Sequence, residues 1–129
     1  MTNEPTPEEI TAVFRALADP NRLRIFAALM RGASCNGWLA EELGLPANLL
    51  SHHLKVLRAA GLIQDRRDVL DGRWIYYQVN LPALTGLHQW LVQFFDPAGA
   101  VLQPPAHLCG PEGKLSGELM LEMGEETAV

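Results

Sequence analysis

The apolar residues along the first 95 positions recur mainly with the spacing of amphipathic helices. Residues that start or stop helices separate five such segments: Asp19 and Pro20 open the second, and Gly44 ends the third. The predicted helices cover residues 7–18, 20–30, 36–43, 46–60 and 82–95. We expect Ser34 to cap the third helix and Pro46 to be the first residue of the fourth. Two short helices joined by a glycine-containing turn are typical of a helix-turn-helix.

The apolar period falls from 3.6 to 2 after Gly61. Residues 62–67 have the pattern of a strand, and residues 73–79 are rich in β-branched and aromatic side chains. Asp71 and Gly72 between them are a strong hairpin signal. A charged hairpin directly after a helix-turn-helix is a wing. The predicted fold is therefore mainly α with a small β-hairpin: a winged helix-turn-helix of about five helices and a two-stranded wing.

The composition fits a single globular domain of 129 residues, with 48% apolar and 19% charged residues. No run approaches the roughly 18 apolar residues that a membrane helix needs. The N-terminus carries Glu4, Glu8 and Glu9 in place of the basic region of a signal peptide. We therefore expect a cytoplasmic protein with no membrane partner.

The net charge of −5 is distributed unevenly. Residues 96–129 hold six acidic residues and one lysine, whereas residues 6–95 hold nine basic and eight acidic residues. Within residues 47–80, five basic residues outnumber three acidic ones, which is a mild basic patch. We predict a disordered N-terminus (1–6), a folded domain (7–95) and a flexible acidic tail (96–129), with only a weak helix at 114–126.

The fourth predicted helix carries most candidate DNA contacts. Its polar residues are Asn48, Ser51, His52, His53 and Lys55. We expect Asn48 and His52 to approach base edges in the major groove, and Ser51 and Lys55 to hold phosphates. A solvated helix face is the alternative for the whole set. His53 directly precedes the apolar Leu54, so a buried histidine is a second interpretation of that residue.

Three arginines flank the predicted hairpin: Arg66, Arg67 and Arg73. An arginine on a wing can enter a narrow minor groove or bind phosphate, and we expect this of Arg67 and Arg73. The alternative is an edge strand charged against aggregation.

The two cysteines, Cys35 and Cys109, are too few for a disulfide framework and should be thiols in a reducing compartment. Trivalent arsenic and antimony are soft and prefer thiolates, so the pair is a candidate metalloid site, within one chain or across a dimer. A redox or persulfide switch and two unrelated cysteines are the alternatives. His107 is a candidate auxiliary ligand, whereas His88, in the apolar stripe of the last helix, is interpreted as an interface or core histidine.

Three segments together resemble the ArsR/SmtB family of winged-helix repressors. They are FRALADPNRLRIFAAL at 14–29, LAEELGLPANLLSHHLKVLRAAGLI at 39–63 and DGRWIYYQVN at 71–80. The resemblance implies a homodimer that pairs through its first and last helices. It also implies that an effector releases the repressor from operator DNA.

The chain departs from the family pattern at the effector sites. Many members carry a Cys-x-Cys pair at the start of the third helix, followed by an acidic residue; here these positions are Cys35, Gly37 and Trp38. Members that bind zinc between their last helices use several Asp, His and Glu ligands, and the last helix here offers only His88. We therefore expect neither the thiolate-rich site of that helix nor the zinc site.

The sequence thus predicts a homodimeric repressor of operator DNA that needs no cofactor and is released by trivalent arsenic or antimony species. A redox-responsive or persulfide-responsive repressor, or one without a thiol effector, is the alternative. An enzyme is not expected, because no Cys–His–acid set falls on ordered elements. A protein-interaction module is a further alternative, because Ala47 and Leu49 make the fourth helix unusually apolar.

Overall fold

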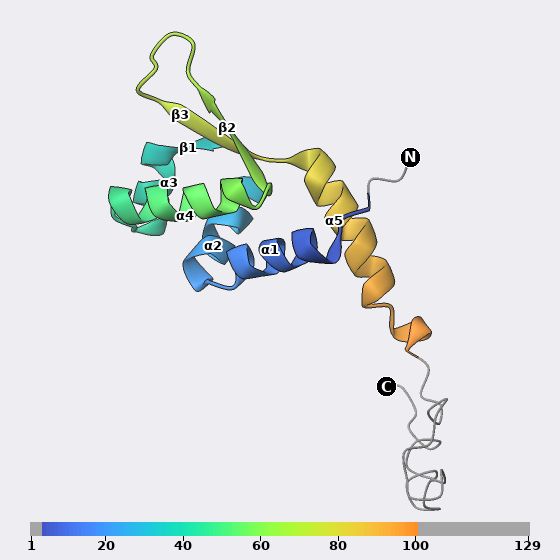
Figure 1. The fold of residues 1–129 in the computed structure, drawn as a ribbon. Coiled ribbons are helices and arrows are strands. Elements are labelled where there is room, and N and C mark those ends of the chain that lie inside the picture. The colour runs from blue at the N-terminus through green and yellow to red at the C-terminus, as the bar shows by residue number, and fades with distance from the viewer. Residues whose placement is uncertain (1–3, 101–129) are drawn as a thin grey trace, which may run out of the picture. The chain divides into compact units, whose positions relative to one another are not determined.

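The computed structural model describes residues 4–100, and the chain divides into two units between Phe94 and Phe95. The first unit contains five helices and three short strands (Figure 1). In chain order these are α1 (Pro7–Leu17), α2 (Pro20–Met30), β1 (Ser34–Cys35), α3 (Asn36–Leu43), α4 (Ala47–Ala59), β2 (Ile63–Arg67), β3 (Ile75–Val79) and α5 (Leu81–Phe94). The predicted winged helix-turn-helix is confirmed, with α3 and α4 as its helix pair.

Local capping explains why the first helices begin and end where they do. Thr6 and Glu9 form a capping box at the start of α1, in which each side chain accepts a hydrogen bond from the other residue's backbone N–H. Asp19 accepts from the N–H groups of Asn21 and Arg22 and so caps α2, as predicted. Gly44 ends α3 in the left-handed conformation, with φ of 64°.

The expected roles of Ser34 and Pro46 need correction. Ser34 does not cap α3, because it belongs to β1 and pairs with Tyr77; Cys35 occupies the cap position without a side-chain hydrogen bond. Pro46 is the residue before α4 and not its first residue. The first error changes the cap residue of α3 but not its bounds, the second shifts the start of α4 by one residue, and the helix pair stays in place.

The sheet has three strands, in the order β1-β3-β2, where a two-stranded wing was predicted. Strands β2 and β3 pair antiparallel with Ile63 opposite Val79 and Arg67 opposite Ile75. The additional strand β1 is two residues long and places Cys35 opposite Tyr76. A pairing this short leaves no periodic signal in the sequence, and it ties the base of the wing to the start of α3.

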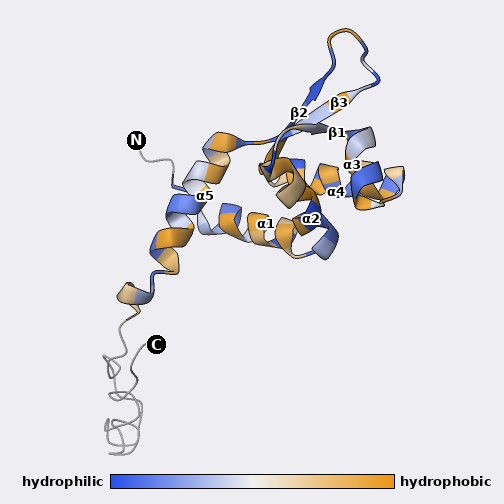
Figure 2. Ribbon diagram, turned by 180° about the vertical axis from the view of Figure 1, so that it is seen from behind, coloured by the Kyte–Doolittle hydropathy of each residue, from blue (hydrophilic) through white to orange (hydrophobic). Residues whose placement is uncertain are grey.

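The core of the first unit lies between α1, α2, α3, α4 and the base of the wing. Its most deeply buried side chains are Ile25, Leu39, Leu50, Leu54, Leu57, Leu62 and Ile63. Three of these, Leu50, Leu54 and Leu57, lie on one face of α4, so burial of this face fixes which side of α4 is turned outward. Apolar residues also run along α1 and α5 (Figure 2), although α5 buries only Leu87.

Residues 95–100 of the second unit contain one 3-10 turn, Pro97–Gly99, capped by Asp96. The predicted tail beyond residue 100, including the weak helix at 114–126, lies outside the described residues. Between residues 4 and 100, no helix has the length and apolar character needed to cross a membrane.

Candidate nucleic-acid interface

The outward face of α4 carries four of the predicted DNA contacts. Asn48, Ser51, His52 and Lys55 are all exposed. Ser51, His52 and Lys55 lie three, four and seven residues after Asn48, which places them on one face of the helix, opposite the buried leucines. This face offers an amide, a hydroxyl, an imidazole and an ammonium group, which suit base edges and phosphates.

His53 lies on the other side of α4, and its predicted DNA contact is corrected here. Its side chain is only 5% exposed, and its Nδ1 atom lies 3.2 Å from Nη1 of Arg22 in α2. The buried-histidine interpretation therefore describes this residue, because the helix rotation that buries Leu50, Leu54 and Leu57 also turns His53 inward.

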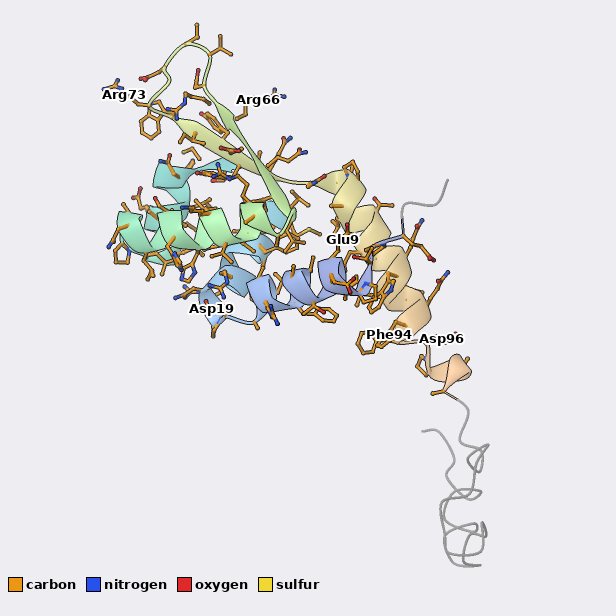
Figure 3. The ribbon with its side chains drawn as sticks, in the orientation of Figure 1. Glu9, Asp19, Arg66, Arg73, Phe94 and Asp96 are labelled. Carbon is orange, nitrogen blue, oxygen red and sulfur yellow. The ribbon has the colours of Figure 1, made fainter. Side chains whose placement is uncertain are left out.

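The wing carries the predicted arginines at exposed positions, and Arg66 and Arg73 project from it in Figure 3. Arg67 donates a hydrogen bond to the carbonyl oxygen of Gly72, across the loop between β2 and β3. Asp68 fixes the same loop by accepting from the N–H groups of Leu70 and Asp71, at 2.8 and 3.3 Å. The loop therefore has a defined conformation from its own hydrogen bonds.

Arg73 is held by Asp71 within this loop. Its Nε donates to Oδ1 of Asp71 at 3.0 Å and its Nη2 donates to Oδ2 at 2.8 Å, while 88% of the arginine side chain is exposed. These hydrogen bonds lower the pKa of Asp71 and raise the pKa of Arg73. Any phosphate that approached Arg73 would have to compete with the Asp71 carboxylate for the guanidinium.

Asp71→Asn is expected to tighten binding to all duplex sequences by about twofold to fivefold, the range of an exposed ion pair. The amide still accepts from the N–H of Arg73 but removes one negative charge beside the DNA. The slope of log K against log salt concentration should become steeper by about one, the change expected for one additional phosphate contact. Anisotropy titrations at several salt concentrations measure both effects. Glu42→Gln, which breaks the Arg31–Glu42 pair outside the wing, is the control and should change neither.

Cys35 is buried, with 8% of its surface exposed, between the wing and α3. It pairs with Tyr76 in the sheet and also occupies the cap position of α3. The next thiolate position of the family pattern is Gly37, where an added Cβ would lie 3.1 Å from the Trp74 ring. A side chain at this position would therefore require the Trp74 ring to shift by a few tenths of an ångström.

The other two candidate ligands, Cys109 and His107, lie outside the described part of the chain. His88 is exposed on α5, so it is not a core residue of this unit. Between residues 4 and 100, no three or more His, Cys, Asp and Glu side chains form a group able to hold a metal ion.

Sequence reasoning missed the contact between Arg22 and His53 and the packing of Trp74 on Gly37. Both join residues that are more than 30 positions apart in the chain. The only sequence signal was indirect: a histidine directly before the apolar Leu54, and a glycine in the first turn of a helix.

Comparison with known proteins agrees with this geometry. Residues 19–65 match the family described as "Bacterial regulatory protein, arsR family". The chain is 34% identical over 84 residues to the transcriptional repressor SdpR of Bacillus subtilis, which covers 65% of this chain and 90% of that protein.

Two solved structures share the fold. NolR from Sinorhizobium fredii is 32% identical with a TM-score of 0.54, covering 68% of this chain and 85% of that one. The homodimeric winged helix-turn-helix DNA-binding domain Mb0332 of Mycobacterium bovis is 27% identical with a TM-score of 0.54, covering 67% and 80%. The chain therefore belongs to the arsR family of bacterial regulatory proteins, which are DNA-binding transcriptional regulators and not enzymes.

Proposed function

We propose that this chain is a repressor that binds operator DNA as a homodimer and releases it when a thiol-binding effector reacts with Cys35 and Cys109. The observation that carries the DNA-binding role is the exposed polar face of α4 beside an arginine-bearing wing. In this arrangement α4 enters the major groove and the wing reaches the neighbouring backbone or minor groove.

The homodimer is supported by α5. This helix is largely apolar but buries only Leu87 in the single chain, and Leu81 and Val92 are 67% and 57% exposed. A second copy is the natural cover for such a helix, because most soluble oligomers are symmetric dimers. The related Mb0332 domain is homodimeric. Two recognition helices in a dimer would meet half-sites about one helical turn apart.

The effector proposal rests on the position of Cys35. This residue links the wing, through β1 and β3, to α3, which packs against α4. A ligand bound at its sulfur therefore disturbs both DNA-contacting elements at once. Trivalent arsenic or antimony is the favoured class because it binds thiolates, and a second thiolate from Cys109 would complete a two-coordinate site. The alternative is a disulfide between the same two thiols, formed when hydrogen peroxide or a persulfide donor accepts their two electrons.

The α4 proposal is tested by separating base contacts from phosphate contacts. Asn48→Ala should cost about 1–3 kcal/mol on a duplex that the protein selects from random sequences, and little on unrelated DNA. Lys55→Ala should weaken both duplexes similarly and reduce the salt slope by about one. Fluorescence anisotropy with both duplexes measures these effects. Equal weakening of both duplexes by Asn48→Ala would contradict a base-reading role.

A further inference from the structure

The guanidinium of Arg22 joins three helices of the first unit. Its Nε donates to the carbonyl oxygen of Ala16 at 2.6 Å, and its Nη2 reaches the carbonyl oxygen of Arg15 at 3.5 Å, both at the end of α1. Its Nη1 lies 3.2 Å from Nδ1 of His53 in α4. Arg22 itself belongs to the first turn of α2, where its backbone N–H donates to Asp19.

The contact with His53 defines the protonation state of the imidazole. A guanidinium can only donate hydrogen bonds, so Nδ1 of His53 must accept. This requires the neutral imidazole with its proton on Nε2. In the imidazolium both ring nitrogens carry protons, so the hydrogen bond is lost and two cations face each other in a partly buried site.

A change at His53 reaches the DNA-contacting face through a single helix. His53 lies between the exposed His52 and the buried Leu54, so its side chain helps to set the rotation of α4. That rotation determines where Asn48 and Ser51 point. The Arg22 contact is therefore placed to contribute, together with the buried leucines, to the orientation of the face that carries the candidate base contacts.

We propose that Arg22 is a positioning residue for DNA binding, which acts through neutral His53, so that protonation of His53 weakens the DNA complex. This inference rests on the proposed role of α4 in contacting DNA. It adds a dependence on acidity that needs neither cysteine.

The charged groups around His53 act in opposite directions. The positive charge of Arg22 disfavours a charged imidazole, whereas the negative charge of Asp19 favours it. The pKa of Asp19 is lowered mainly by its hydrogen bond from the backbone N–H of Arg22, and the charges of Arg22 and His53 lower it further. The groups that α1 contributes to this site are the backbone carbonyl oxygens of Arg15 and Ala16, which accept hydrogen bonds from Arg22. On the elements packed around this site, Arg58 forms an ion pair with Asp65 and Arg31 forms one with Glu42.

His52 is the neighbouring titratable group, with its ring centre 5.6 Å from that of His53. It is exposed on the DNA-contacting face, so its protonation adds a positive charge toward phosphate and strengthens binding. Protonation of His53 should therefore weaken DNA binding, and protonation of His52 should strengthen it. The direction in which affinity changes with pH distinguishes the two histidines.

The test measures affinity of the full chain for its selected duplex by anisotropy, from about pH 8 to about pH 5.5, the range in which imidazoles titrate. Acidification should weaken DNA binding by the wild type by about tenfold, a loss of about 1.4 kcal/mol of binding free energy. His53→Gln retains an acceptor for Arg22 but cannot be protonated, so its affinity should stay flat or rise. His52→Gln, the matched control, should keep the acid-induced weakening.

A second variant tests Arg22 itself. Arg22→Met removes the donors but keeps an unbranched apolar stem, and it should weaken binding several-fold at about pH 8 without the wild-type pH dependence. Thermal melting at each pH shows whether the domain stays folded. Equal acid weakening in His53→Gln, a tightening of the wild type, or weakening that accompanies unfolding would overturn the proposal. If the wild type selects no duplex at about pH 8, the α4 proposal fails as well.

Discussion

A trivalent arsenical added to the protein–operator complex is expected to release the DNA almost completely. The reason lies in the position of Cys35, which is both a member of the sheet and the cap residue of α3. Because only 8% of this residue is exposed, a ligand bound at its sulfur is expected to displace its close neighbours in the sheet and at the start of α3. The ligand-bound state should therefore have a disturbed wing base and a disturbed start of α3.

Complete release requires the effector to favour the DNA-free state of the protein by a large free-energy difference. Reversal from mostly bound to mostly free DNA needs a preference of about 5.5 kcal/mol for the released state. The two arsenic–thiolate bonds must therefore form in the released state and be largely prevented in the DNA-bound state, because a ligand with equal affinity for both states shifts nothing. The wild type should therefore lose operator binding in a mobility shift, and antimonite should act in the same way.

The matched controls are Cys35→Ser and Cys109→Ser. Each variant should bind the operator as the wild type does and fail to respond to the arsenical. Release that persists in the double Cys→Ser protein would exclude the thiol site. Release by hydrogen peroxide or a persulfide donor, without any response to arsenicals, would favour the redox alternative, a disulfide between the same two residues.

The periodic features of the sequence were sufficient to predict the helices and the wing. The leucines of α4 recur at helical spacing, and Gly44 and Gly61 lie shortly before and after the helix. Both ends of α4 were therefore predicted to within one residue. Strand β1 was missed because two residues cannot show a period. Its pairing with β3 is set by the tertiary structure, which also overrode the capping tendency of Ser34.

The candidate site was predictable only where helix geometry decides which way a residue points. The exposure of residues 48, 51, 52 and 55 could be predicted because they lie opposite the apolar face of α4. His53 lies at the border of the two faces, where the sequence allows either environment; in the structure it is buried, with Nδ1 3.2 Å from Nη1 of Arg22. The Asp71–Arg73 pair was likewise not foreseen, because turn residues were considered for their backbone preferences and not for their charges.

The second large effect concerns the dimer. Leu81, Thr85, His88 and Val92 are exposed and spaced along one face of α5, so they form a stripe that runs the length of the helix. On the other side of α5, Trp90 packs edge-on against Phe14 of α1, with ring centres 6.4 Å apart. The packing of α5 on α1 within one chain therefore leaves the stripe available to a second copy.

Val92→Glu is expected to convert the proposed dimer to a monomer and to lower operator affinity by about 10²–10⁴-fold. An unpaired carboxylate would be buried against the partner, which costs several kcal/mol. A monomer also loses the effective concentration that couples binding at two half-sites. Gln93→Glu adds the same charge one residue further along α5, outside the stripe, and should remain dimeric. Sedimentation at micromolar concentration and operator titrations measure both effects; a Val92→Glu protein that stays dimeric, or a monomer with undiminished affinity, would refute this arrangement.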